Sequence, residues 1–190
     1  GRAMHQLRAF SDGVDTVLTW VARVTGWLFL AAIFVICFDV ITRKLGFQLP
    51  YFTSTRLQEL EWHLTATLFL GWLAFGVIKN THVRIDVLTM TRSQRTKDWI
   101  DLIGVVLFAL PMCLIVVPFA WDYAFTSWAQ WEGSDAPNGL PGRYIIKTIA
   151  ALGLTLLLAA ALSLLARRIV DLFGPPAWHS KNGAGEGVEV

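Results

Sequence analysis

The sequence lacks the residue patterns on which most enzymes and cofactor-binding proteins depend. It has two cysteines in 190 residues and no CxxC motif, which argues against a disulfide oxidoreductase. It also has no HExxH helix, phosphate-binding glycine loop or nucleophile triad. Of its four histidines, His63 and His82 flank opposite ends of one apolar stretch, and His5 and His179 lie near the chain ends, so no pair suits bis-histidine haem. We therefore expect no enzymatic activity, no metal and no cofactor.

Charged residues are scarce too, at 16% of the chain, whereas hydrophobic residues make up 55%. Four apolar stretches fill most of the sequence, approximately residues 24–41, 63–78, 100–119 and 145–166. A helix of roughly 20 residues crosses the hydrocarbon core, and the second stretch reaches this length once Trp62 and Lys79 are counted as interfacial ends. A soluble bundle would show polar stripes, and residues 29–36 contain no polar side chain. The sequence predicts an all-α polytopic membrane protein with four transmembrane helices.

The positive charges predict how these helices are oriented. Eleven Lys and Arg residues lie in the N-terminal segment, the loop after the second stretch and the C-terminal tail, against five in the other two loops. Because such residues stay cytoplasmic, both termini should be inside and the first and third loops outside. We expect one membrane domain over residues 1–173 and a disordered cytoplasmic tail over residues 174–190. In the first outer loop, Leu57, Leu60 and Leu64 recur at helical spacing and predict a short interfacial helix that runs into the second span.

A few charged residues lie near the predicted membrane ends and need partners there. Arg43 follows Asp39 by one helical turn, so an ion pair is the simplest account of both. Glu59 and His63 share a face at the start of the second helix, whereas Glu61 points almost opposite. One histidine and two carboxylates are a weak metal signal, and hydrogen bonds between helices or subunits are favoured.

Small residues predict where helices can approach each other closely. Thr67 with Gly71, and Ala159 with Ser163, form pairs of small residues four positions apart. Such pairs can pack against a partner subunit or within the bundle itself.

Two loops carry patterns that suggest contact surfaces. The inner loop alternates polar and apolar residues over 82–87, which suits either a segment held against a partner or a solvated connector. The outer segment 128–141 has two glycines and two prolines near its end, which favour a defined turn. Trp128 and Trp131, with Glu132 and Asp135, could receive a periplasmic partner. The alternative is that both tryptophans lie in the headgroups and hold the loop flat.

Several motifs, taken in order, resemble the small permease subunits of tripartite ATP-independent periplasmic (TRAP) transporters, the DctQ type. LQELEWHL at 57–64 and ATLFLG at 66–71 are similar to the start of that family's second helix, and HVRIDV at 82–87 resembles its inner-loop signature. Four further motifs resemble a subgroup labelled mannitol/chloroaromatic: SW at 127–128, EGS at 132–134, GLP at 139–141 and YIIK at 144–147. Tyr144 stands where that subgroup has Trp, and Ala150 and Ala151 stand where Pro is usual.

The resemblance implies a small subunit that scaffolds a large permease subunit in the bacterial inner membrane. The complex would import a small organic acid delivered by a periplasmic binding protein, in symport with an ion, with sodium coupling expected in the large subunit. Membrane lipids are the other partners, and nucleic acid is not expected. The candidate contact residues are Asp39, Arg43, Glu59, Glu61, His82, Arg84, Asp86, Trp128, Glu132, Gly139, Leu140, Pro141 and Lys147. The alternative is a membrane anchor for an electron-transfer complex.

Overall fold

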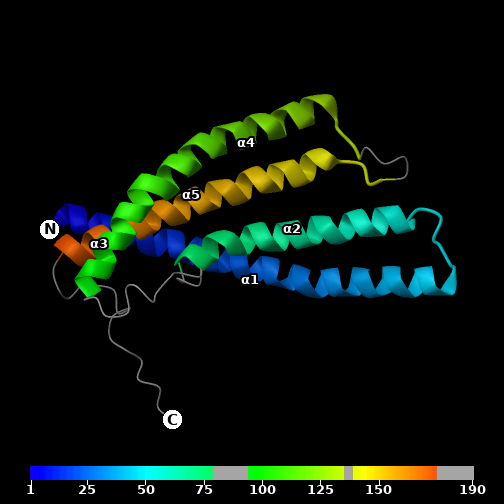
Figure 1. Ribbon diagram of the computed structural model, residues 1–190, viewed down its shortest axis with the longest axis horizontal. Coiled ribbons are helices and arrows are strands. Elements are labelled where there is room, and N and C mark those ends of the chain that lie inside the picture. Colours follow the sequence, from blue (N-terminus) through cyan, green and yellow to red (C-terminus); the bar gives the residue numbers. More distant parts are fainter. Residues whose placement is uncertain (79–93, 135–138, 175–190) are drawn as a thin grey trace, which may run out of the picture.

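A computed structural model describes residues 1–78, 94–134 and 139–174, and this part of the chain is helical apart from short connections (Figure 1). The helices are α1 (Arg2–Leu45), α2 (Ser54–Ile78), α3 (Gln94–Gly104), a π-helix η2 (Val105–Ala109), α4 (Leu110–Gln130) and α5 (Arg143–Phe173). The predicted all-α fold is confirmed for these residues. His82, Arg84, Asp86 and Asp135, and all but the first residue of the predicted tail, lie outside the described residues.

Three helical segments of the described chain are long and apolar enough to cross a membrane: Arg2–Leu45, Arg95–Gln130 and Arg143–Phe173. The chain therefore has the helices of a membrane protein. Helix α2 is not among the three, although its 25 residues rise by about 37 Å. The predicted interfacial helix forms the first turns of α2 without a break. Four spans and the position of this segment in the headgroups remain predictions.

The helices alternate in direction, so the connections α1–α2 and α4–α5 lie together at one end of the molecule and the helix ends nearest the termini lie at the other (Figure 1). The α1–α2 and α4–α5 connections lie at one end, called here the loop end. The start of α1, helix α3 and the last turns of α5 lie at the other, called here the terminal end. By the distribution of Lys and Arg, the loop end is expected outside the cell and the terminal end inside.

Helix α5 is the centre of the fold, because it contacts α1, α2, α3, η2 and α4. Leu18, Ala74 and Ala160 form a buried cluster where α1, α2 and α5 meet. Within the described residues, α4 contacts neither α1 nor α2, and Figure 1 shows it on the far side of α5. The fold is therefore a three-helix core to which α4 is attached through α5, and much of the α4 surface stays uncovered.

Small residues allow the close approaches inside this core. A Cβ atom at Gly71 would lie 2.6 Å from Thr25 Cγ2 of α1, and one at Gly153 would lie 2.8 Å from Leu70 Cβ of α2. Ser163 of α5 meets Ser11 of α1, with the two Oγ atoms 2.9 Å apart. Gly71 and Ser163 therefore pack within the chain, which answers the question left open by their spacing.

A π-helix separates α3 from α4 and lies just before Pro111. Because proline has no N–H, the carbonyl of the residue four positions earlier loses its α-helical partner. In η2 the Leu110 N–H donates to the Val105 carbonyl, five residues back, which is the π-type bond. Pro118 removes a second donor inside α4. These changes account for the curvature of α4 in Figure 1.

Candidate functional site

The predicted ion pair between Asp39 and Arg43 is present near the loop end of α1. Arg43 Nη2 lies 2.7 Å from Asp39 Oδ2, and the Asp39 side chain is fully buried while that of Arg43 is half exposed. Ser54, the first residue of α2, donates its hydroxyl to Asp39 Oδ1 at 3.2 Å. The pair therefore faces the start of α2 and joins the loop ends of the first two helices.

Glu61 adds a second carboxyl group beside this ion pair. Burial raises the pKa of Glu61, and the negative charge of Asp39 raises it further, against the opposing charge of Arg43. Glu61 Oε1 is buried and meets no hydrogen-bond partner within the described residues. Burial beside Asp39 therefore favours the neutral form of Glu61.

Glu59 holds the outer segment onto α2. Its Oε2 accepts a hydrogen bond from the Leu140 N–H at 2.6 Å, and its Oε1 accepts one from the Ser134 hydroxyl. Burial opposes ionisation of Glu59, but these hydrogen bonds and the charge of Arg143 outweigh it and lower the pKa. A Cβ atom at Gly139 would overlap the Ser134 side chain and come within 2.7 Å of Glu59 Oε1. Only glycine therefore fits this turn as it stands.

Glu132 holds the same segment onto α4 and α5. It forms an ion pair with Lys147 and accepts a hydrogen bond from the Ser127 hydroxyl at 2.8 Å. The hydrogen bond from Lys147, followed by that from Ser127, lowers the pKa of Glu132. The Lys147 ammonium also lies 4.1 Å from the centroid of the Tyr123 ring. The charges of Glu132 and Lys147 therefore find their partners within the chain.

Aromatic rings surround this contact at the loop end. The Tyr144 ring lies 4.1 Å from that of Trp128 and 5.6 Å from that of Trp131, edge to face with the latter. Trp128 Nε1 donates to Thr148 Oγ1 at 2.6 Å, whereas Trp131 ends α4 in the left-handed conformation and is 71% exposed. The residues of the outer segment that are described on either side of 135–138 are therefore held in place by contacts with α4 and α5.

The structure brings the candidate contact residues that it describes to the loop end, and it uses many of their charges internally. Asp39, Glu59, Glu132 and Lys147 all have partners within the chain. Trp131 and Pro141 remain exposed. A role of the paired residues toward another subunit remains a prediction.

A buried cluster at the terminal end was not predicted. Arg168 of α5 is 4% exposed and is surrounded by three aspartates. Its Nη1 lies 3.2 Å from Asp98 Oδ1 and 3.1 Å from Asp171 Oδ2, and its Nε lies 3.1 Å from Asp101 Oδ2. Asp98 and Asp101 lie one turn apart on α3, and this spacing is the sequence feature that could have indicated a shared basic partner. The cluster fixes α3 to the last turns of α5.

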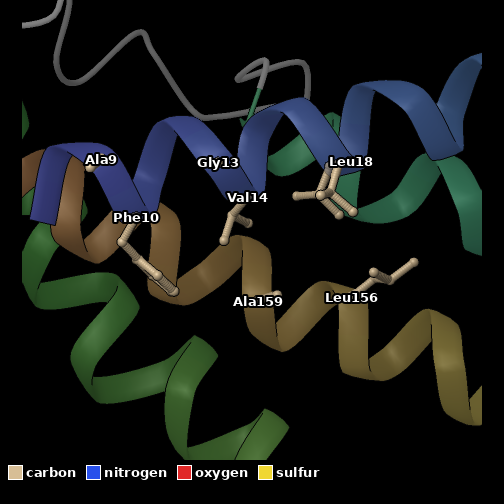
Figure 2. A pocket seen from close by; sticks show the side chains of 8 residues that line it. Ala9, Phe10, Gly13, Val14, Leu18, Leu156 and Ala159 are labelled. Carbon is tan, nitrogen blue, oxygen red and sulfur yellow. The ribbon is translucent and has the colours of Figure 1, made fainter. Parts of the chain in front are cut away.

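A second terminal-end contact joins α1 to α5. Asp15 forms an ion pair with Arg167 and accepts a hydrogen bond from the Ser163 hydroxyl at 2.6 Å. Next to it, a groove of about 360 Å³ runs between the two helices. Figure 2 shows Phe10, Val14 and Leu18 projecting from α1 toward α5. The groove lining is apolar, so it offers no group that would recognise an organic acid.

No described residues form a group of three or more His, Cys, Asp or Glu side chains that could hold a metal ion. What the described residues build is a set of helix-to-helix and loop-to-helix contacts at both ends of an apolar bundle. That arrangement can position a protein in a membrane and present surfaces to partners.

The comparison with protein families agrees with this architecture. The model of the family described as "Tripartite ATP-independent periplasmic transporters, DctQ component" matches residues 32–171, from the middle of α1 to the end of α5. No curated protein and no solved structure gave a significant match. The chain belongs to the DctQ family and is the small membrane subunit of a TRAP transporter.

Proposed function

We propose that the chain scaffolds the large permease subunit of its transporter in the bacterial inner membrane and forms no part of the substrate path. The complex takes up a small organic acid that a periplasmic binding protein delivers. An ion gradient, with sodium bound in the large subunit, drives this symport. The small subunit itself is not an enzyme and carries no cofactor. The anchor of an electron-transfer complex, the alternative from the sequence, gains no support from the family match.

One observation carries the proposal: the charged groups lie mainly at the two ends of α5, and the stretch between them is apolar. Lys147 pairs with Glu132 at the loop end, and Arg167 pairs with Asp15 at the terminal end. The residues from 148 to 166 contain no charge and rise by about 30 Å, the thickness of the hydrocarbon core. A carboxylate that crossed along α5 would find no compensating charge on that helix.

The position of α2 in the bundle supports the proposed topology of four spans with both termini inside. Helix α2 runs antiparallel to α1 and contacts both α1 and α5, so it occupies the same layer as its neighbours. Two residues of α2 pack on its neighbours inside the bundle: Gly71 on Thr25 of α1, and Leu70 on Gly153 of α5. On this proposal α2 is the fourth span, and the terminal end is cytoplasmic.

The mannitol/chloroaromatic subgroup is supported by the outer segment. The GLP motif at 139–141 forms the turn that Glu59 holds, which gives a structural reason for a glycine there. Tyr144 packs on Trp128 and Trp131 at the position where the subgroup has Trp, so it keeps the aromatic contact.

Co-purification tests the proposed function. The complete transporter is expressed with a tag on this chain, extracted in mild detergent and captured through the tag. The large permease subunit should be retained in about equal amount. Capture of the chain without the large subunit, at equal membrane levels of both, would contradict the proposal.

A further inference from the structure

Helix α4 carries a regular line of exposed residues on its uncovered side. Met112, Ile115, Phe119, Asp122 and Thr126 follow one another at intervals of three and four residues, and all five are exposed. This spacing places them along one face, as in the seams by which helices pack on each other. These five residues are called the α4 stripe below. Because α4 contacts only α5 and η2 among the described elements, nothing within them covers the stripe.

The α4–α5 contacts place Asp122 well below the loop end. Its neighbour Trp121 donates from Nε1 to Thr155 Oγ1 of α5 at 2.8 Å. Thr155 lies about 12 Å along the helix from Lys147, which marks the loop end of the uncharged α5 stretch. Asp122 therefore lies beside the uncharged stretch of α5, within the length that the proposed topology places in the hydrocarbon core.

Asp122 differs from three other aspartates of the bundle in having no cationic partner within the described residues. Asp39 is paired with Arg43, Asp15 with Arg167, and Asp98 with Arg168. Asp122 is exposed and makes no hydrogen bond or ion pair with any residue that the structure describes. A carboxylate that faces lipid at this depth is costly, and such residues normally face another protein segment that supplies a partner.

We propose that the α4 stripe docks on a helix of the large permease subunit that presents a Lys or Arg side chain to Asp122. This inference rests on the proposed function and names the surface through which the scaffold acts. Ile115 and Phe119, at 62% and 71% exposure, supply the apolar contact on the cytoplasmic side of the charge. The carboxylate selects a basic partner and fixes the register of the two helices.

Two other occupants fit the stripe less well. A second copy of this chain related by a two-fold axis through the stripe would bring two Asp122 carboxylates together, and like charges repel at such a contact. A lipid amine would have to leave the headgroup layer to reach a carboxylate beside the uncharged stretch of α5, which is unfavourable in hydrocarbon.

The test combines charge variants with crosslinking in the complete transporter. Asp122→Asn and Asp122→Lys are compared with Asp12→Asn and Asp12→Lys, since Asp12 is an exposed aspartate on α1. We expect about a tenfold or greater loss of retained large subunit for Asp122→Asn, and a larger one for Asp122→Lys, because a charge would be left without its partner. The Asp12 variants should retain the large subunit at the wild-type level.

A photo-crosslinker at Phe119, with Asp122 left intact, tests the same surface without removing the charge. It should capture the large subunit, and a crosslinker at Trp27, exposed on α1, serves as the comparison position. Full retention by both Asp122 variants, or crosslinks from Phe119 only to lipid or to a second copy, would overturn the inference while the proposed function stands. Failure of the wild-type chain to retain the large subunit would overturn both.

Discussion

Glu61 of α2 lies close enough to Asp39 of α1 for the charge of Asp39 to raise the pKa of Glu61, and Arg43 lies beside both. The two acidic groups and one basic group form a compact contact that joins the loop ends of the first two helices. Asp39 is bound to Arg43 and Ser54, whereas Glu61 Oε1 has no hydrogen-bond partner within the described residues.

Replacing Glu61 with Gln should change how stability depends on pH. The raised pKa of Glu61 means that the folded state binds this proton more tightly than the unfolded state. Stability from this group is therefore full below the ordinary value of 4.5 and falls as pH rises from 4.5 toward the raised pKa. The amide of Gln is neutral at every pH and so carries no burial penalty for ionisation. Relative to wild type, E61Q should gain stability as pH rises, by about 1 kcal/mol.

Thermal unfolding in detergent between pH 4 and pH 8 measures this difference, and Glu59→Gln is the matched control. The lowered pKa of Glu59 gives the opposite sign, so E59Q should lose stability above pH 4.5, where the carboxylate accepts from Leu140. If E61Q and E59Q shift with pH in the same direction, the pKa of Glu61 is not raised in the folded protein.

Asp39 and Arg43 should behave as a coupled pair in a double-mutant cycle. Arg43→Gln leaves the fully buried Asp39 without its cation and should cost about 2 kcal/mol, less than for a fully buried pair because Arg43 is half exposed. Adding Asp39→Asn should recover part of that loss. Chemical unfolding of the three variants and of wild type gives the coupling energy, and strictly additive losses would show that the two do not interact.

Gly139→Ala should loosen the outer segment, whereas Gly133→Ala should not. A Cβ atom at Gly139 meets Ser134 and Glu59, but one at Gly133 meets nothing within 4 Å. Hydrogen exchange of the Leu140 amide, which donates to Glu59, should speed up by about tenfold or more in the first variant alone, as overpacking there costs about 1–3 kcal/mol. Equal exchange in both would mean that Glu59 does not hold the turn.

Cysteine labelling tests the proposed orientation. Cys37 and Cys113 are replaced first, and single cysteines are then introduced for Asp135 in the third loop and for Asn182 in the tail. An impermeant thiol reagent added to intact cells should modify only the cysteine at 135, because the Lys and Arg distribution places the tail inside. Modification at 182, or none at 135, would reverse or break the proposed topology.

The sequence predicted features set by short spacings and missed those set by contacts between distant segments. The Asp39–Arg43 pair follows from one helical turn, and the glycines and prolines of the outer segment indicated its turn. The Arg168 cluster joins α3 to α5 across 70 positions, so the spacing of Asp98 and Asp101 on one helical face could indicate a shared partner but not that it is Arg168.

Asp122 shows the same limit for membrane depth. The third apolar stretch ends at residue 119, and hydropathy alone gives no level for Asp122 relative to the neighbouring helices. The helix continues to Gln130, and the bond from Trp121 to Thr155 sets the level of Asp122 against α5. Depth in the bilayer depends on how neighbouring helices are aligned, and that alignment is a long-range property.

The central claim is that this subunit supports transport without forming the path. Uptake of a radiolabelled organic acid into proteoliposomes under a sodium gradient tests it most directly, with the binding protein added outside. The complete complex should accumulate the acid, and the purified chain alone should give the level of empty liposomes, because α5 offers no charge between its two ends. Sodium-dependent uptake by the chain alone would contradict the account.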